Sequence, residues 1–190
     1  MGGTSTKKKG RESASRKSRR RFLWLGVAAV GVVAIGLLVT SGGGFDLEPT
    51  SNIGLEPAPE IALPNFEGET VRISDFEGQG LVVNYWASWC LPCLVELPGF
   101  EEVYQERKGE VAFLGINLAD DPASALSVAG GAGITYPLAV DVDGSSYKAF
   151  GGLAMPTTVF INSDGYVVEV FSGPLKSSEL EARIESYFES

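Results

Sequence analysis

The sequence predicts an α/β fold with a central mixed β-sheet flanked by helices. Residues 81–86 form a continuous apolar run, typical of a strand buried on both faces, and 111–118 form a second one. Between them, 90–108 carries apolar residues at three- and four-residue spacing, which indicates a helix. This order implies parallel pairing through a right-handed crossover. A late antiparallel hairpin, with strands at 157–162 and 166–172 around a Ser-Asp-Gly turn, makes the sheet mixed.

Shorter elements complete the predicted domain. Strands at 59–64 and 70–74 surround the turn Glu67-Gly68 as an N-terminal hairpin. The segment Asp141-Val142-Asp143-Gly144 is predicted to form a turn, because the longer ligand series and terminal Glu of an EF-hand calcium loop are missing. The remaining elements are a helical insert at 123–129 that Gly130, Gly131 and Gly133 end, a short strand at 138–140, a helical turn at 145–150, and an amphipathic helix at 177–188 that buries Leu180, Ile184, Tyr187 and Phe188.

The two cysteines of the chain, Cys90 and Cys93, lie three residues apart, shortly after the first central strand. A helix whose first turn carries both thiols directs its unpaired N–H groups and its positive dipole end at a sulfur, which favours thiolate over thiol. This arrangement predicts a thiol–disulfide exchange centre. A purely structural disulfide is the alternative, but a bridge that closes so short a loop removes little chain entropy and stabilises little.

The composition excludes several other functions. The chain has no histidine and no third cysteine, so a four-ligand zinc site, a Cys-x-x-Cys-His haem attachment and a Cys–His nucleophile pair all lack residues. We therefore expect neither a metal nor a cofactor. From residue 57 onward the chain has 20 acidic and 6 basic side chains, and such an acidic domain is not expected to bind nucleic acid.

The two thiols are expected to have different roles. Cys90 leads the helix and should be the more exposed sulfur, so we assign it as the nucleophile. Cys93, one turn further on, should be buried and should attack the mixed disulfide to release the client. The reverse assignment is the alternative, and the position of Cys90 at the helix terminus disfavours it.

The segment before the domain predicts a membrane anchor. Residues 1–21 are a basic tail, and 22–39 are an uncharged run of 18 residues, about 27 Å as a helix and just enough to cross the hydrocarbon core. No Lys or Arg follows until Arg72, so the positive-inside rule places the tail in the cytoplasm and the rest outside. Residues 40–56, with three consecutive glycines, are expected to form a flexible tether before the domain at 57–190.

Two other interpretations of this segment stay open. A cleaved signal peptide also has a basic region followed by an apolar one, although Val39-Thr40-Ser41 is a mediocre cleavage site. The segment Ser18-Arg19-Arg20-Arg21-Phe22-Leu23 resembles a twin-arginine export signal, which is a receptor-read address and not an anchor. Each route places the domain in an oxidising compartment, where disulfides form and persist.

Two motifs resemble those of the thioredoxin superfamily: Trp89-Cys90-Leu91-Pro92-Cys93 after the first central strand, and Met155-Pro156-Thr157-Thr158 before the late hairpin. The resemblance covers roughly residues 58–190. The anchor, the helical insert after Leu118 and the segment 84–96 are most similar to the TlpA/ResA-like reductases, including those of cytochrome c maturation. The implied architecture is a thioredoxin-like fold behind one N-terminal transmembrane helix.

The resemblance implies roles for residues in and after the cysteine motif. Cys90 and Cys93 are expected to form a redox-active disulfide. Glu96 is expected to be buried near the thiols and to tune their proton affinity, since an apolar setting would raise its pKa and let it exchange protons with Cys93. A solvated surface Glu is the alternative. Pro98 should kink the helix, as a proline at that place does in thioredoxins.

The resemblance also implies a substrate-binding surface. Pro156 is expected to be cis, although most X-Pro bonds are trans, and to lie in a loop that faces the cysteines. The backbone of Met155 would pair with an extended client peptide by strand addition. Trp89 is expected to be a partly exposed platform that excludes water, and Pro92 completes this surface. The alternative is that Trp86 and Trp89 are ordinary core aromatics.

The predicted function is that of a thiol–disulfide oxidoreductase held in the cell membrane by a single span, with its catalytic domain outside the cytoplasm. The resemblance implies reduction of client disulfides, with apocytochrome c the leading client class, and a membrane electron donor that recharges the dithiol. A general thiol oxidase or isomerase is the first alternative, because two residues between the cysteines do not fix the redox poise. A peroxiredoxin-type peroxidase would need Pro at Val83 and Thr at Ala87. A non-catalytic binding module is the last alternative.

Overall fold

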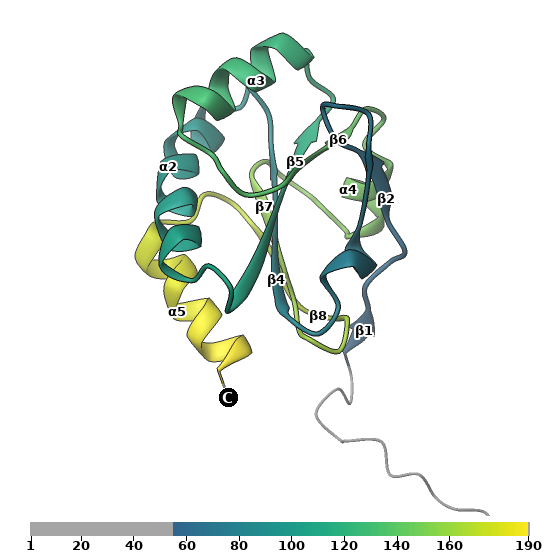
Figure 1. The fold of residues 1–190 in the computed structure, drawn as a ribbon, viewed down its shortest axis with the longest axis vertical. Helices are drawn as coiled ribbons and strands as arrows, with labels where there is room; N and C mark the ends of the chain where they lie inside the picture. Colours follow the sequence, from purple (N-terminus) through teal and green to yellow (C-terminus); the bar gives the residue numbers. More distant parts are fainter. Residues whose placement is uncertain (1–54, 190) are drawn as a thin grey trace, which may run out of the picture. The chain divides into compact units, whose positions relative to one another are not determined.

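A six-stranded sheet forms the centre of the domain in the computed structural model, which describes residues 55–189 (Figure 1). The strand order is β1-β8-β7-β4-β5-β6, with β4, β5 and β6 parallel to one another and the other pairs antiparallel. The predictions of a mixed sheet and of parallel pairing across the first helix are confirmed. The strands are β1 (Glu56–Pro57), β4 (Gly80–Trp86), β5 (Val111–Leu118), β6 (Leu138–Asp141), β7 (Thr157–Ile161) and β8 (Tyr166–Ser172).

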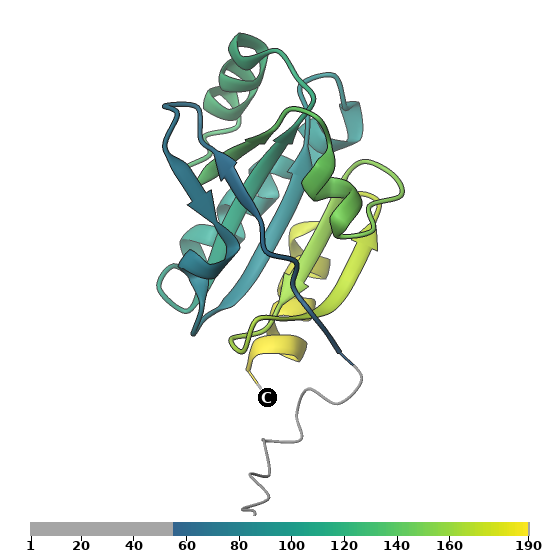
Figure 2. The same ribbon diagram turned by 90° about the vertical axis from the view of Figure 1, so that its right-hand side faces the viewer.

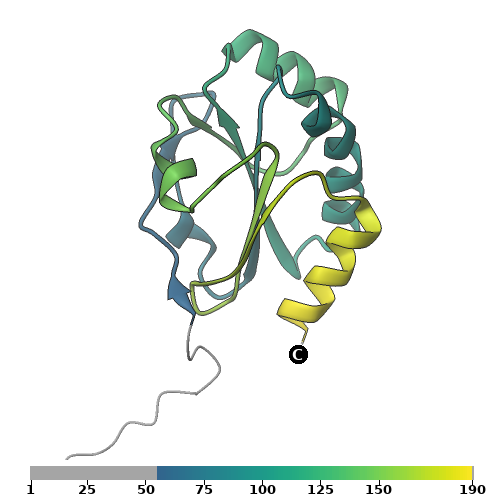
Figure 3. The ribbon, with the colours of Figure 1, turned by 180° about the vertical axis from the view of Figure 1, so that it is seen from behind.

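The other elements cover the two faces of this sheet. They are the hairpin β2 (Ala62–Pro64) and β3 (Thr70–Arg72), the 3₁₀ helix η2 (Ile73–Phe76), and the helices α2 (Leu91–Glu106), α3 (Pro122–Gly131), α4 (Ser145–Ala149) and α5 (Ser177–Phe188). Helices α2 and α5 lie side by side on one face (Figure 3). The hairpin, η2 and α4 lie on the other face (Figure 2).

The core has one half on each face of the sheet. Every residue of β4 is buried, because successive side chains of a strand point to opposite faces and both faces are covered. Toward α2 and α5, β4 contributes Val82 to a cluster with Phe100, Phe113, Phe160, Leu180 and Ile184. Toward the hairpin and α4, β4 contributes Leu81, Val83 and Tyr85 to a cluster with Ile116, Val159 and Ile161.

Several element boundaries differ from the predicted ones. The short strand β1, paired with Val167 and Tyr166 of β8, was not predicted. Helix α3 runs through Gly130 and Gly131, because a glycine weakens a helix by about 1 kcal/mol without breaking it. After the helix, Gly133 is the first residue in the left-handed region, with φ of 75°.

The ends of the hairpin and of two helices also differ. Both hairpin strands are shorter than predicted: β2 begins at Ala62, and β3 ends at Arg72 because η2 takes up the residues that follow. Helix α2 begins at Leu91 and ends at Glu106; it contains Pro98, as predicted, while the kink there stays a prediction. In α5, Leu180 and Ile184 are buried as predicted, whereas the two aromatic residues at its end are only partly buried.

The predicted basic tail, membrane span and most of the predicted tether lie outside the described residues. Within 55–189, no helix combines the length and the apolar character needed to cross a membrane. The anchor at 22–39 therefore stays a prediction from sequence.

Candidate functional site

The cysteine pair lies at the start of α2, directly beyond the end of β4. Cys90 is the N-cap residue of the helix, and Pro92 lies in its first turn. Cys90 and Cys93 form a disulfide with an S–S distance of 2.03 Å and a Cα–Cα distance of 5.3 Å. Their exposed fractions are 5% and 0%. Cys90 is thus the more exposed of the two, as predicted, but in the oxidised protein it too is buried.

Asp120 holds the loop that leads to Cys90. Its carboxylate accepts hydrogen bonds from the backbone N–H of Ser88 at 2.5 Å and from the Ser88 hydroxyl at 2.6 Å. It also accepts one from the side-chain amide of Asn117 at 2.9 Å. Burial opposes the charge of Asp120, but these hydrogen bonds outweigh it and lower its pKa. Asp120 was not predicted from the sequence; its signal is a carboxylate just after the carboxyl end of a strand parallel to β4.

An apolar surface surrounds the disulfide. Trp89 is 59% exposed, as predicted for a platform, and its indole N–H donates to the carbonyl of Ala119 at 3.4 Å. Leu91 and Val95, one turn apart on α2, are also strongly exposed, and Pro92 is exposed between them. Trp86, in contrast, is a fully buried core aromatic. These residues form an exposed apolar surface next to Cys90; that a client binds there stays a prediction.

The sheet register brings Pro156 to the same end of the molecule. Thr157 pairs with Tyr85, so the residue before Thr157 lies beside the end of β4, where the chain turns toward Cys90. The Met155–Pro156 peptide bond is cis, as predicted. Met155 packs against the cluster that contains both cysteines. Segments separated by more than 60 residues of sequence thus meet at the disulfide.

Glu96 lies inside the protein, 4% exposed, on the sheet-facing side of α2. Its Oε1 accepts a hydrogen bond from Nδ2 of Asn84 at 2.9 Å, and its Oε2 accepts one from the backbone N–H of Leu175 at 3.0 Å. Burial raises the pKa of Glu96 to about 7, and the two hydrogen bonds only partly offset this. The interpretation of Glu96 as a solvated surface residue is therefore wrong, because α2 turns this position toward the sheet.

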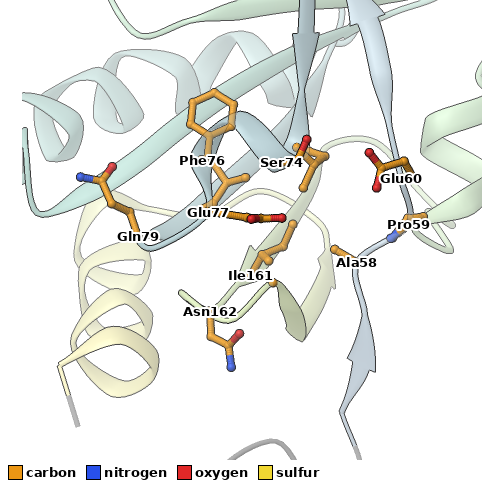
Figure 4. A pocket seen from close by; sticks show the side chains of 12 residues that line it. Ala58, Pro59, Glu60, Ser74, Phe76, Glu77, Gln79, Ile161 and Asn162 are labelled. Carbon is orange, nitrogen blue, oxygen red and sulfur yellow. The ribbon is translucent and has the colours of Figure 1, made fainter.

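A separate small pocket lies at the other end of β4. It is lined by residues that include Phe76, Glu77, Leu81 and Ile161 (Figure 4). Leu81 is at the start of β4, whereas Cys90 follows its end, so this pocket does not belong to the disulfide site. Among residues 55–189, no cluster of three or more His, Cys, Asp or Glu side chains is arranged to hold a metal ion.

Comparisons with known proteins agree with this site. The Redoxin family matches residues 55–184. The thiol-disulfide oxidoreductase ResA of Geobacillus kaustophilus is 28% identical over 172 residues, which cover 90% of this chain and 98% of the relative. The ResA protein of Bacillus subtilis is 29% identical over 164 residues, or 86% of this chain and 90% of the relative.

Solved structures share the fold. A putative thiol:disulfide interchange protein DsbE from Chlorobium tepidum superposes with a TM-score of 0.65 at 26% identity, covering 70% of this chain and 96% of that one. A DsbF homologue from Corynebacterium diphtheriae gives a TM-score of 0.66 at 26% identity, covering 77% and 96%. The fold is therefore thioredoxin-like, and the substrates are protein thiols and disulfides. With its Cys90–Cys93 pair, the chain belongs to the Redoxin family and is a TlpA/ResA-like thiol–disulfide oxidoreductase of the thioredoxin superfamily.

Proposed function

We propose that this oxidoreductase works as a reductant of specific client disulfides outside the cytoplasm. The observation that carries the exchange chemistry is the buried carboxyl of Glu96, three residues after Cys93 on the same helix, with a pKa of about 7. The reducing direction rests on the resemblance to TlpA/ResA-like reductases. Residues three apart on a helix are neighbours, with about 5–6 Å between their Cβ atoms. Near neutral pH such a group is present both as an acid and as a base, which suits it to exchange a proton with the adjacent thiol.

The proposed reaction has two exchange steps. The thiolate of Cys90 attacks one sulfur of the client disulfide, so that a mixed disulfide forms and the first client sulfur leaves as a thiolate. Cys93 then gives its proton to the carboxylate of Glu96 and attacks Sγ of Cys90. This closes the Cys90–Cys93 disulfide and releases the second client thiolate. The client gains two electrons and the Cys90–Cys93 dithiol loses two.

The client and the location are further parts of the proposal. The resemblance to TlpA/ResA-like reductases, which include those of cytochrome c maturation, favours apocytochrome c as the client class. The ResA-named thiol-disulfide oxidoreductases, which match 90% and 86% of this chain, support the oxidoreductase activity on which this choice rests. The basic tail and the apolar run at 22–39 support a single-pass membrane anchor with the catalytic domain outside. A reductant in an oxidising compartment must be recharged, so the proposal includes a membrane donor of electrons.

Trapping with Cys93→Ala tests this proposal. Without the second sulfur, the mixed disulfide between Cys90 and the client cannot be resolved, so covalent adducts should accumulate in the native host. We expect apocytochromes c among them, identified by mass spectrometry after non-reducing electrophoresis. Cys90→Ala is the matched control and should trap few or none.

Two outcomes would overturn parts of the proposal. If adducts form with Cys90→Ala and not with Cys93→Ala, the roles of the two cysteines are reversed. If the trapped proteins are newly secreted, unfolded proteins in general, the chain acts as an oxidase or isomerase and not as a reductant of specific clients.

A further inference from the structure

A polar side chain lies in the middle of the most buried strand. Asn84 is 1% exposed, and the other residues of β4 are apolar apart from the glycine at its start and the hydroxyl of Tyr85. Its Nδ2 donates to Oε1 of Glu96. Its Oδ1 is buried and accepts no hydrogen bond from any residue that the structure describes. The NH₂ group of this amide thus makes a hydrogen bond, whereas its oxygen makes none within the described part of the chain.

The second oxygen of Glu96 has a different kind of partner. The backbone N–H of Leu175 donates to Oε2 at 3.0 Å. A backbone N–H is a donor only and cannot accept a proton. When Glu96 becomes neutral, the arrangement that keeps both contacts therefore has the proton on Oε1, the oxygen that faces Asn84.

A side-chain amide can serve either form of such a carboxyl, because it has a donor at one end and an acceptor at the other. The NH₂ end suits the carboxylate. A half-turn about the last side-chain bond brings Oδ1 to the same place, where it accepts a hydrogen bond from the O–H of the neutral acid. We propose that Asn84 is a positioning residue that holds Glu96 in both its charged and its neutral form by turning its amide over.

The surroundings of the amide fit this proposal. Thr158 is the register partner of Asn84 across β4 and β7, so its side chain lies on the same face of the sheet. Its hydroxyl is buried and has no hydrogen-bond partner among the described residues. A hydroxyl both donates and accepts hydrogen bonds. Either the NH₂ group or the oxygen of the Asn84 amide can therefore lie on the side of Thr158.

Among the described residues, few other titratable groups face Glu96. On α2 itself, Cys93 precedes Glu96 by three residues, and in the oxidised protein it does not titrate. In the segment before β6, burial raises the pKa of Tyr136 and the charges of Glu101 and Glu96 raise it further, so Tyr136 stays neutral. Strand β4 and the segment before α5 contribute Asn84 and the N–H of Leu175, neither of which titrates.

The inference deepens the proposed role of Glu96 and rests on it. If Asn84 serves both forms, the carboxyl keeps a partner before and after it takes the proton of Cys93. An unpaired polar group in the core costs more than its hydrogen bond gains. A group that can only donate would hydrogen-bond to the carboxylate and not to the O–H of the neutral acid. It would therefore hold Glu96 in its charged form.

The test is a titration of the full, oxidised chain in detergent micelles, followed by nuclear magnetic resonance. The carboxyl carbon of Glu96 and the side-chain amide of Asn84 are observed between about pH 5 and 9, a window that covers the pKa of about 7. We expect both signals to shift with one shared midpoint. In Glu96→Gln the amide of Asn84 should show no titration in this range. Neither measurement requires a client or a redox partner.

Substitution of Asn84 gives the second readout. In Asn84→Leu the midpoint of Glu96 should rise by about one pH unit, because the lost bond to the charged form is about twice as strong as the lost bond to the neutral form. Tyr136→Phe is the matched control: it removes a buried polar atom near Glu96 that has no hydrogen-bond partner among the described residues. It should leave the midpoint within about 0.3 pH units, since Tyr136 is neutral throughout this range.

Two results would overturn the inference. One is an Asn84 amide whose signals do not change while Glu96 titrates. The other is a Glu96 midpoint that stays the same in Asn84→Leu. The amide titration needs no substitution at Asn84, so it decides the matter even if that variant does not fold. Neither result would change what the trapping experiment is expected to show. A failed trap, in turn, would not change the expected titration.

Discussion

At the scale of single residues, the position of Glu96 explains its chemistry. Burial penalises its charged form, and two hydrogen bonds favour that form, yet burial is the larger effect and the pKa rises to about 7. A surface glutamate with the same two donors would have a pKa below its usual range. The useful proton affinity of Glu96 therefore depends on the packing of α2 against the sheet.

The raised pKa predicts how stability depends on pH. The unfolded chain loses the Glu96 proton near pH 4.5 and the folded chain near pH 7, so the folded state binds more protons in this window. Stability therefore falls as the pH rises from 4.5 to 7, by about 3 kcal/mol. Glu96→Gln mimics the neutral form and should lose this contribution to the pH dependence.

Urea unfolding of the two oxidised proteins at pH 5 and pH 8 measures this difference. The variant should gain in stability relative to the wild type on going from pH 5 to pH 8. An equal change in both proteins would mean that Glu96 titrates at its ordinary pKa.

Residues of this kind are hard to predict from sequence. Glu96 was found through the family resemblance, since its spacing from Cys93 alone is compatible with a surface position. Asn84 and Asp120 carry no motif of their own. Their roles depend on contacts with Glu96 and Ser88, which are distant in sequence and meet only after β4, β5 and α2 have packed.

At the scale of elements, close packing of strands supports the site. Gly115 lies in β5 beside β4, where it is paired with Asn84 in the parallel register. A Cβ at this position would lie 2.6 Å from Leu138, 3.0 Å from Tyr136 and 3.2 Å from the indole nitrogen of Trp86. The absence of a side chain thus lets three large residues close over the sheet on the side of the disulfide.

Replacement of Gly115 should be destabilising. Gly115→Ala forces Leu138 and Tyr136 to move, and overpacking of this kind costs about 1–3 kcal/mol. Gly99→Ala is the control, because Gly99 is within α2 and its added Cβ would meet only ordinary contacts at 3.5 Å or more. That change should be neutral or stabilising by up to about 1 kcal/mol. Thermal unfolding compares the two; equal effects would show that β5 tolerates a side chain there.

Most elements were predictable because their periodicity is strong. The apolar runs of β4 and β5 and the amphipathic pattern of α5 predict their type without help from tertiary contacts. Strand β1 has only two residues and forms because β8 offers its edge, and η2 replaces the end of the predicted strand at 70–74. Such short elements are decided by their neighbours, so local sequence cannot specify them.

At the scale of the whole molecule, the strand order brings all parts of the site to one end. Helix α2 begins where β4 ends, Asp120 follows the parallel strand β5, and cis-Pro156 precedes the antiparallel strand β7. The thioredoxin-like architecture and the pair Cys90–Cys93 follow from sequence motifs. The direction of electron flow does not, because it depends on the difference in free energy between the dithiol and the disulfide.

The reduction potential of the Cys90–Cys93 pair tests the central claim most directly. It is measured by equilibrating the chain with glutathione or dithiothreitol buffers at pH 7 and quantifying the free thiols. A reductant of client disulfides should have a potential close to that of thioredoxin, about −270 mV. A potential near that of the strong oxidant DsbA, about −120 mV, would contradict the proposal and assign the chain to thiol oxidation.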